Sequence, residues 1–321
     1  MQINRRRFSA LLPAMLAPTS AVRAQDRNVR ILVGYAAGGA VDLVARAVAE
    51  GMRDSGYTAI VENKSGASGR LATDALLMAP PDGASLVMAP TGNLTLAPHI
   101  FKSVRHDLLA QLTGVSTAAD MSFALAVGAN SPAKTLKDYL SLAKSNPAYA
   151  TYGTPGAGTA MDFIGQILSR ESGVALTGIP YKGGSAAVTD AIGGTLSAVI
   201  TTLPNLIPLH RSGKLRLLAT SDAQPNSSFP EIPTFKALGF PSLVVSETFA
   251  FFARTGTPQP ATDRLHRAID AAVKSAKVRA VLTKAEFEPR SMAPDELNRL
   301  IRSEYARWAE IVKSTGYTAG A

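Results

Sequence analysis

Short apolar runs alternate with amphipathic segments along the first third of the chain. The apolar runs predict buried strands, and apolar positions three and four residues apart predict helices. The expected strands lie at 29–34, 59–62 and 85–89, and the expected helices at 41–52 and 70–78. Strands that alternate with helices in this way indicate parallel pairing through right-handed crossovers.

The same alternation continues through the middle third of the chain, and helices dominate the last third. The predicted strands are 149–152, 177–181, 196–201 and 215–219, and the predicted helices are 136–145, 159–170, 185–192, 203–211, 261–276, 278–284 and 294–315. Two longer apolar runs flank the middle third, at 122–128 and 243–252. We expect these two runs to cross between domains.

These patterns predict an α/β fold of two domains, with the middle third inserted into the first domain. Domain 1 is expected to comprise residues 25–124 and 248–321, and domain 2 residues 125–247. The carboxyl ends of the strands and the starts of the helices would then meet in the cleft between the domains, where such folds bind ligands. No internal repeat and no low-complexity tract is apparent.

Three glycine-rich turns each connect a predicted strand to a predicted helix, at 35–42, 152–159 and 181–185. Such a turn leaves backbone N–H groups uncovered at the start of a helix, where the helix dipole is positive. Only one lysine lies among the three turns. The pattern therefore indicates a protein that holds a small anion with backbone amides, and it gives no sign of chemistry performed on that anion.

Signatures of other functions are missing. The spacing Gly153-x-x-Gly156-x-Gly158 fits neither the dinucleotide fingerprint nor the P-loop, and no G-K-[ST] sequence occurs. The chain has no G-x-S-x-G elbow and no cysteine, and its four histidines lack metal-ligand spacing. We therefore expect no nucleotide, metal or other cofactor and no catalytic residues.

The N-terminus predicts export. Arg5-Arg6-Arg7 precedes an apolar stretch at 8–21, and Val22-Arg23-Ala24 provides a cleavage site before Gln25. The Arg-Arg-x-Phe sequence also fits a twin-arginine signal. Removing residues 1–24 deletes four arginines and no acid, so the net charge falls from +9 to +5. No basic stretch interleaved with aromatic residues remains, which argues against nucleic-acid binding.

Two charged residues in the turns have open roles. Asp42 would either cap the first turn by accepting N–H bonds or meet an amino group on a ligand. Lys182 would either pair with a ligand carboxylate or lie at the rim of the cleft.

A set of short motifs occurs in a fixed order through the chain. They are Gly38-Gly39-x-x-Asp42-x-x-Ala45-Arg46, Val61-Glu62-Asn63-Lys64-x-Gly66-Ala67-x-Gly69, Pro81-Asp82-Gly83, Tyr152-Gly153-x-x-Gly156-x-Gly158-Thr159, Pro180-Tyr181-Lys182-Gly183, Gly213-Lys214-Leu215-Arg216, Pro230-x-Ile232-Pro233-Thr234 and Gly256-Thr257-Pro258, followed by Trp308 and Gly316. With them the mature chain resembles the Bug, or TctC-like, extracytoplasmic solute receptors of tripartite tricarboxylate transporters.

The resemblance implies a type II periplasmic binding protein of the Venus-flytrap kind, with its ligand cleft between the domains. It implies a monomeric receptor, without enzymatic activity, that binds a dicarboxylate or tricarboxylate, an acidic amino acid or an aromatic acid for membrane transporter subunits. By the same resemblance the ligand is held by backbone amides and ordered waters, and the implied binding residues are Gly38, Gly39, Asp42, Gly158, Thr159, Lys182, Gly183 and Gly184. We add Thr91 and Thr202 as binding residues because their hydroxyls follow the ends of predicted strands.

The chain departs from the family pattern at three places. Ala37 stands where proline is usual, Met161-Asp162 replaces a serine-histidine pair, and Glu247-Thr248-Phe249 occupies a crossover where tryptophan is usual. Asp162 and Glu247 would bring negative charge to the cleft if they face it, and that charge would repel a polyanion.

Two other functions remain open at this level. The same fold could act as a solute sensor that signals to a sensor kinase in the membrane. A secreted hydrolase or isomerase of carboxylic acids would need a positioned acid or base, for which Asp42, Lys182 and Glu247 are the candidates.

Overall fold

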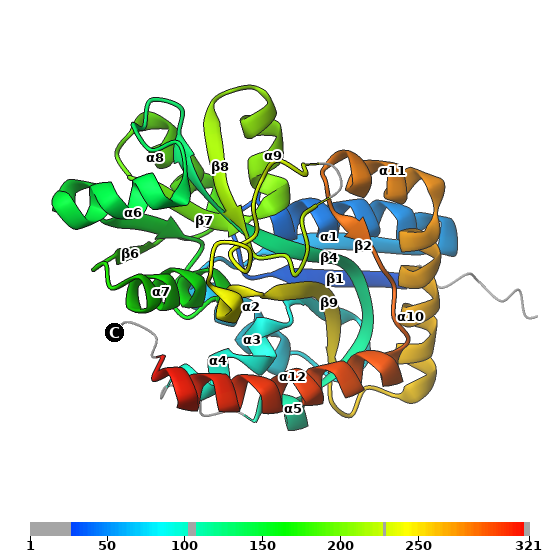
Figure 1. The fold of residues 1–321 in the computed structure, drawn as a ribbon. Coiled ribbons are helices and arrows are strands. Elements are labelled where there is room, and N and C mark those ends of the chain that lie inside the picture. The colour runs from blue at the N-terminus through cyan, green and yellow to red at the C-terminus, as the bar shows by residue number, and fades with distance from the viewer. Residues whose placement is uncertain (1–26, 102–106, 227–228, 318–321) are drawn as a thin grey trace, which may run out of the picture.

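The computed structural model describes residues 27–101, 107–226 and 229–317. The predicted export signal and its cleavage site lie outside the described residues. Two α/β domains lie on either side of a long shared strand, β4 (Leu112–Gly128), which runs from one into the other (Figure 1). Across the described ranges, none of the helices is long and apolar enough to cross a bilayer.

The first domain is built on the strands β1 (Arg27–Val33), β2 (Tyr57–Asn63) and β3 (Ser85–Pro90), with β1 between the other two and all three parallel, as the alternating pattern predicted. The return strand β9 (Ser246–Arg254) joins β3 and β4 in antiparallel fashion, and β10 (Glu288–Pro289) pairs with β4. The helices of this domain are α1 (Ala40–Gly51), α2 (Arg70–Leu77), α3 (Gly92–Thr95), α4 (Ala97–Ile100), α5 (Leu108–Gln111), α10 (Gln259–Lys274), α11 (Ala276–Lys284) and α12 (Pro294–Thr315).

The apolar character of β1 follows from its position between two helical layers. Ile31 packs in the cluster that contains residues of α1 and α10, while the neighbouring Leu32 packs in a cluster with residues of α2 and α12. A strand that is covered on both faces reads as a continuous apolar run and not as an alternation of apolar and polar residues.

The second domain repeats the parallel arrangement with β5 (Thr151–Thr154), which lies between β6 (Thr177–Pro180) and β7 (Ala198–Thr202). The strand β8 (Leu215–Thr220) pairs antiparallel with β4. It therefore departs from the parallel pairing expected for the alternating segments. The helices of this domain are α6 (Leu136–Ser145), α7 (Ala160–Ser172), α8 (Gly184–Gly193) and α9 (Leu203–Arg211).

The strand β4 is longer than its sequence predicts. Its second half matches the apolar run expected at 122–128, but the strand begins at Leu112 and pairs with β9 over its first half. Polar residues interrupt the apolar run in this first half, so the hydropathy pattern does not predict a strand there. Thr117 is fully buried, where its hydroxyl donates to the Arg290 carbonyl at 2.6 Å and accepts from the Met292 N–H at 2.9 Å. These bonds satisfy the hydroxyl and allow it to lie inside the sheet.

The last helix links the two domains. In Figure 1, α12 runs along the lower edge of the first domain and ends close to α7 of the second. Trp308 of α12 meets Phe163 of α7 edge to face, with ring centroids 4.9 Å apart. Beyond the helix, the Tyr317 hydroxyl donates to Asp162 at 3.1 Å. On another loop, the Ser68 hydroxyl donates to the Ala157 carbonyl at 2.6 Å. The loop before α7 and α7 itself therefore contact the first domain at both of these places.

Candidate functional site

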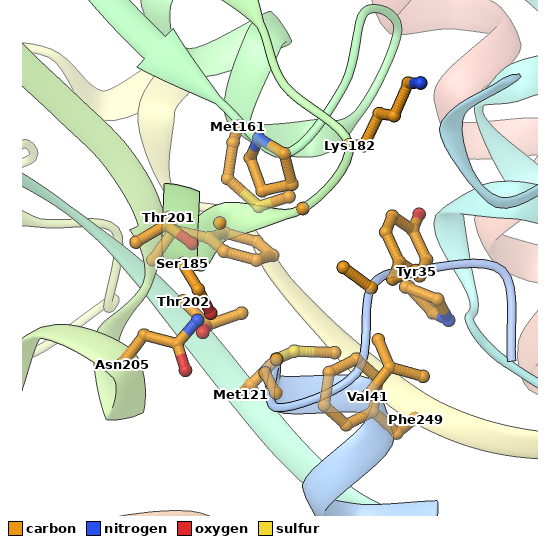
Figure 2. Close-up of a pocket in the computed structure, with 18 of the residues that line it drawn as sticks. Tyr35, Val41, Met121, Met161, Lys182, Ser185, Thr201, Thr202, Asn205 and Phe249 are labelled. Atoms are coloured by element: carbon orange, nitrogen blue, oxygen red, sulfur yellow. The ribbon is translucent and has the colours of Figure 1, made fainter. Parts of the chain in front are cut away.

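A cavity of about 140 Å³ lies where the two domains meet. Its walls come from the loops that precede α1, α7 and α8, from the ends of β3 and β7, from α9, from the middle of β4 and from the first residues of β9 (Figure 2). All three predicted glycine-rich turns therefore contribute to one cavity. We call this space the central cavity.

The first turn is held in shape by Asp42. This buried carboxylate accepts hydrogen bonds from the Gly38 N–H, the Arg46 side chain and the Asn63 amide, each at 2.9 Å. Burial favours the neutral acid, but the bonds from Arg46, Gly38 and Asn63 outweigh it and lower the pKa of Asp42. Gly38 adopts φ 79°, in the left-handed region that glycine tolerates best. Of the two roles open for Asp42, the structure shows the cap.

The second turn has the same construction. The Gly158 N–H donates to Asp162 at 2.7 Å, and Gly158 has φ 70°. The two turns share the sequence Gly-x-Ala-x-Asp, at 38–42 and 158–162, so a short repeat is present where none was expected. Asp162 lines a separate cavity behind α7 together with Tyr152 and Gln166. It therefore does not bring its charge to the central cavity.

Helix starts provide the polar part of the central cavity. The first N–H groups of an α-helix have no partner within the helix. Ala40 and Val41, at the start of α1, and Gly184 to Ala186, at the start of α8, all line the cavity. The two helix starts face each other: a Cβ added to Gly39 would lie 4.0 Å from the Ser185 Oγ. The N–H groups of Gly38 and Gly39 are used within the loop, by Asp42 and by the Ala36 carbonyl.

Side chains on the α8 and α9 side add hydrogen-bonding groups. Figure 2 shows the polar ends of Ser185, Thr202 and Asn205 pointing toward one another at one end of the cavity. Among the described residues, the buried hydroxyls of Thr201 and Thr202 have no hydrogen-bond partner. A buried hydroxyl without a partner is costly. Both therefore gain from a ligand that brings an acceptor or donor within reach.

The rest of the wall is apolar. Val41, Met121, Phe123, Met161 and Phe249 line the central cavity. The side chain of Lys182 is exposed, and Figure 2 shows its ammonium group directed away from the other labelled side chains. This arrangement corresponds to the rim position considered for Lys182.

Glu247 brings a carboxyl group to this wall. It is 7% exposed, and burial, together with the charge of Glu304, raises its pKa to about 8, against a smaller lowering effect of the Gly92 N–H. Gly92 has room for no side chain, because an added Cβ would overlap the Glu247 carboxyl. Glu247 is thus one of the departures from the family pattern that does face the cavity.

The predicted binding residues fall into three groups. Those that line the central cavity are Gly39, Lys182, Gly183, Gly184 and Thr202; Thr91 lines an adjoining cavity; and Gly38, Asp42, Gly158 and Thr159 shape the turns without lining either cavity. Four further residues line the central cavity that were not predicted as binding residues: Val41, Met161, Ser185 and Asn205. The shared Gly-x-Ala-x-Asp sequence was the signal for Val41 and Met161, since each occupies its fourth position.

We predict that Asp42→Ala lowers the free energy of unfolding by about 2 kcal/mol at pH 7, since hydrogen bonds to a charged group contribute about 1.5–3 kcal/mol. Because the folded-state pKa of Asp42 is lowered, this contribution is present above its ordinary pKa and is lost as the pH falls through the lowered value. Urea unfolding of both proteins between pH 7 and pH 3 checks this. Equal stabilities at pH 7, or a difference that grows in acid, contradict the capping role.

In the part of the chain that the structure describes, no three or more His, Cys, Asp or Glu side chains are grouped so that they could hold a metal ion.

Comparison with known proteins shows the family. The sequence model of the tripartite tricarboxylate transporter family receptor, TctC, matches residues 44–317. A UPF0065 protein from the gbd 5' region of Cupriavidus necator is 33% identical over 306 residues, which cover 95% of this chain and 92% of that protein. Protein BugT of Bordetella pertussis is 30% identical over 302 residues, covering 94% of this chain and 93% of its own.

Solved structures show the same fold. The periplasmic binding protein BugD has a TM-score of 0.85 at 28% identity, with 90% of this chain and 97% of BugD covered. MatC from Rhodopseudomonas palustris, solved with bound malate, has a TM-score of 0.82 at 27% identity, with 89% and 98% covered. An R. palustris protein solved with adipate has a TM-score of 0.84 at 26% identity, with 90% and 97% covered. These matches confirm the two-domain binding-protein fold and the resemblance that the motifs carry, and the chain belongs to the family of tripartite tricarboxylate transporter receptors.

Proposed function

We propose that this protein is a periplasmic receptor that closes on a small carboxylate and presents it to the membrane subunits of a tripartite tricarboxylate-type transporter. The observation that carries the proposal is the pair of helix starts, those of α1 and α8, that face one cavity between the domains. Their N–H groups and dipoles favour a carboxylate, and the surrounding apolar wall excludes water that would compete for it.

The bound molecules of two structural neighbours support this class of ligand. MatC was solved with malate and the second R. palustris protein with adipate, and both molecules are small carboxylates. The ligand-binding roles of Gly39, Gly183, Gly184 and Thr202 belong to this proposal, as do indirect roles of Gly38, Asp42, Gly158 and Thr159 in shaping the turns.

Domain closure contributes to the affinity. A helix start stabilises an anion by about 0.3–1 kcal/mol when exposed and by up to about 2 kcal/mol in a partly buried site. A micromolar Kd corresponds to about −8 kcal/mol. Two helix starts therefore supply only part of the binding free energy, and hydrogen bonds from Ser185, Thr202 and Asn205 in a closed cleft supply more.

We propose binding without turnover. General acid–base chemistry needs a donor and an acceptor within reach of one substrate. Asp42 is occupied as a cap, the Lys182 ammonium points away, and Glu247 carries the only carboxyl group among the described residues that line the central cavity. These three were the candidates for a hydrolase or isomerase.

The remaining features of the proposal come from the sequence. They are export with cleavage after Ala24, a monomeric state, and domain boundaries at 25–124 with 248–321 and at 125–247. The path of β4 through both sheets is consistent with the first boundary.

A thermal-shift titration tests the function. The purified mature protein is titrated with monocarboxylates, dicarboxylates, tricarboxylates and amino acids. A receptor gains RT ln(1 + [L]/Kd) on binding, about 2.7 kcal/mol at a hundredfold excess over Kd, so we expect a saturable rise in Tm with at least one of them. The absence of any saturable rise across all these classes, or turnover of a bound acid, contradicts the proposal.

A further inference from the structure

Glu247 has no role in the carboxylate site described so far. Among the described residues that line the central cavity, it carries the only carboxyl group. A buried acid in a site that attracts anions is unfavourable unless a counter-charge offsets its burial, and the bond from the Gly92 N–H offsets only part of that cost. Its position and surroundings indicate which partner fits.

The strand pairing places the Glu247 side chain on the cavity wall. Glu247 is the register partner of Met121 on β4, and residues two apart on a strand point to the same face. Glu247 and Phe249 of β9 therefore lie on the same face as Met121 and Phe123 of β4. The carboxyl group is thus set into an apolar surface.

The space behind this wall is acidic. A second cavity of about 370 Å³ adjoins the central one and shares Met121 and Glu247 with it. The acids that line this second cavity, besides Glu247, are Asp120, Asp222, Glu286, Glu288 and Glu304.

The basic residue of the second cavity is already engaged. Arg290 pairs with Asp120 at 2.9 Å, and Arg211 on α9 pairs with Glu286. On the other side, Tyr35 is buried, and burial and the charge of Glu247 raise its pKa against the smaller lowering effects of the Asn93 hydrogen bond and the Arg70 charge. The surroundings of Glu247 therefore carry a negative field, which disfavours a second carboxylate at this position and favours a cation.

We propose that the cleft takes an α-amino acid with an apolar side chain, whose ammonium group binds Glu247 while its carboxylate sits at the helix starts of α1 and α8. The inference rests on the proposed carboxylate-binding function. The apolar side chain packs against Val41, Phe123 and Met161, which line the same cavity. One ligand thereby supplies a carboxylate for the helix starts, an ammonium group for the buried acid and an apolar side chain for the cavity wall.

Binding of such a ligand has a protonation signature. With its pKa raised to about 8, Glu247 is mostly protonated in the empty cleft at pH 7. An ammonium partner favours the ionised form, so binding at pH 7 releases a proton and tightens as the pH rises toward 8. A ligand that places a carboxylate at Glu247 needs the protonated acid, and its binding weakens over the same range.

Isothermal titration calorimetry of the full mature protein tests the proposal. The probes are L-valine, L-leucine, L-methionine and L-phenylalanine, each paired with its analogue that lacks only the amino group, together with succinate. Titrations in two buffers of different ionisation enthalpy at pH 7 report the protons released. We expect at least one amino acid to bind tenfold or more tightly than its analogue, with proton release.

Two variants distinguish a direct contact between Glu247 and the ligand ammonium group from the general effect of neighbouring acids. Glu247→Gln should weaken the amino acid tenfold or more and leave the analogue unchanged or tighter. Glu304→Gln, which removes a neighbouring acid that does not line the central cavity, should change the amino acid affinity by less than about threefold. Circular dichroism confirms that both variants are folded.

The outcomes are distinct. If analogues or succinate bind and the amino acids do not, or if Glu247→Gln leaves amino acid binding unchanged, the inference is overturned and the receptor function stands. If neither these probes nor the wider panel of carboxylates binds, both proposals are overturned.

Discussion

Replacing Gly39 by valine should weaken ligand binding by at least a hundredfold while the protein remains folded. Gly39 has φ −81°, which a non-glycine residue adopts without strain. An added Cβ would lie 3.3 Å from the Ala36 carbonyl and 4.0 Å from the Ser185 Oγ. The two methyl groups of valine would extend further into the space between the helix starts of α1 and α8, where the carboxylate is proposed to bind.

Calorimetry with the ligand found by thermal shift gives the affinity, and urea unfolding gives the stability. Gly193→Val is the matched control, because Gly193 is an exposed residue at the end of α8 with no atom within 4 Å of an added Cβ. Gly184→Val is a poorer choice, since its Cβ would overlap the Thr201 hydroxyl and displace α8. A folded Gly39→Val protein with unchanged affinity would refute the placement of the carboxylate.

Replacing Glu247 by glutamine should raise the free energy of unfolding of the empty protein by about 3 kcal/mol at pH 7. The pKa of Glu247 rises from 4.5 to about 8 on folding, so the acid is ionised in the unfolded chain and mostly neutral in the folded one at pH 7. Each unit between the two values costs about 1.4 kcal/mol. This decrease in the free energy of unfolding is absent below pH 4.5, grows as the pH rises toward 8, and is constant above that. Glutamine mimics the protonated acid and removes it.

Urea unfolding of the two proteins from pH 5 to pH 8.5, without ligand, measures this difference. The gap between the variant and the parent should widen with pH and then level off. Glu304→Gln should reduce, without abolishing, the loss in free energy of unfolding that the raised pKa of Glu247 causes. Glu304 is the second cause of that raised pKa after burial. A constant gap across the range would show that Glu247 does not titrate as proposed. We interpret the penalty as a cost to stability that ligand binding relieves.

Most helices and strands of the fold could be predicted from the hydropathy pattern. The helices α6, α9 and α12 begin at their expected starts, because an amphipathic face or a proline marks them. The first half of β4 could not be predicted in this way. Its buried Ser116 and Thr117 owe their position to partners near residue 290, far along the chain, and no local pattern reports such partners.

The candidate site, too, could be predicted from the sequence only in part. Glycines before a helix marked the three turns that meet at the central cavity, because the local backbone requirement is visible in the sequence. The orientation of the acids was not visible. Asp42 and Asp162 accept hydrogen bonds within their own turns, from Gly38 and Gly158, whereas Glu247 lies on the wall of the central cavity. The position of Glu247 depends on the strand register. The Gly-x-Ala-x-Asp repeat was available in the sequence as a sign that Asp42 and Asp162 have one role.

The most direct test of the account is a crystal structure of the mature protein with the ligand identified by the thermal-shift titration. The account predicts that the ligand carboxylate lies in the central cavity, with its oxygens about 2.7–3.2 Å from N–H groups at the starts of α1 and α8. A ligand held in the acidic second cavity, or one whose carboxylate pairs with a lysine or arginine side chain away from these helix starts, would contradict it.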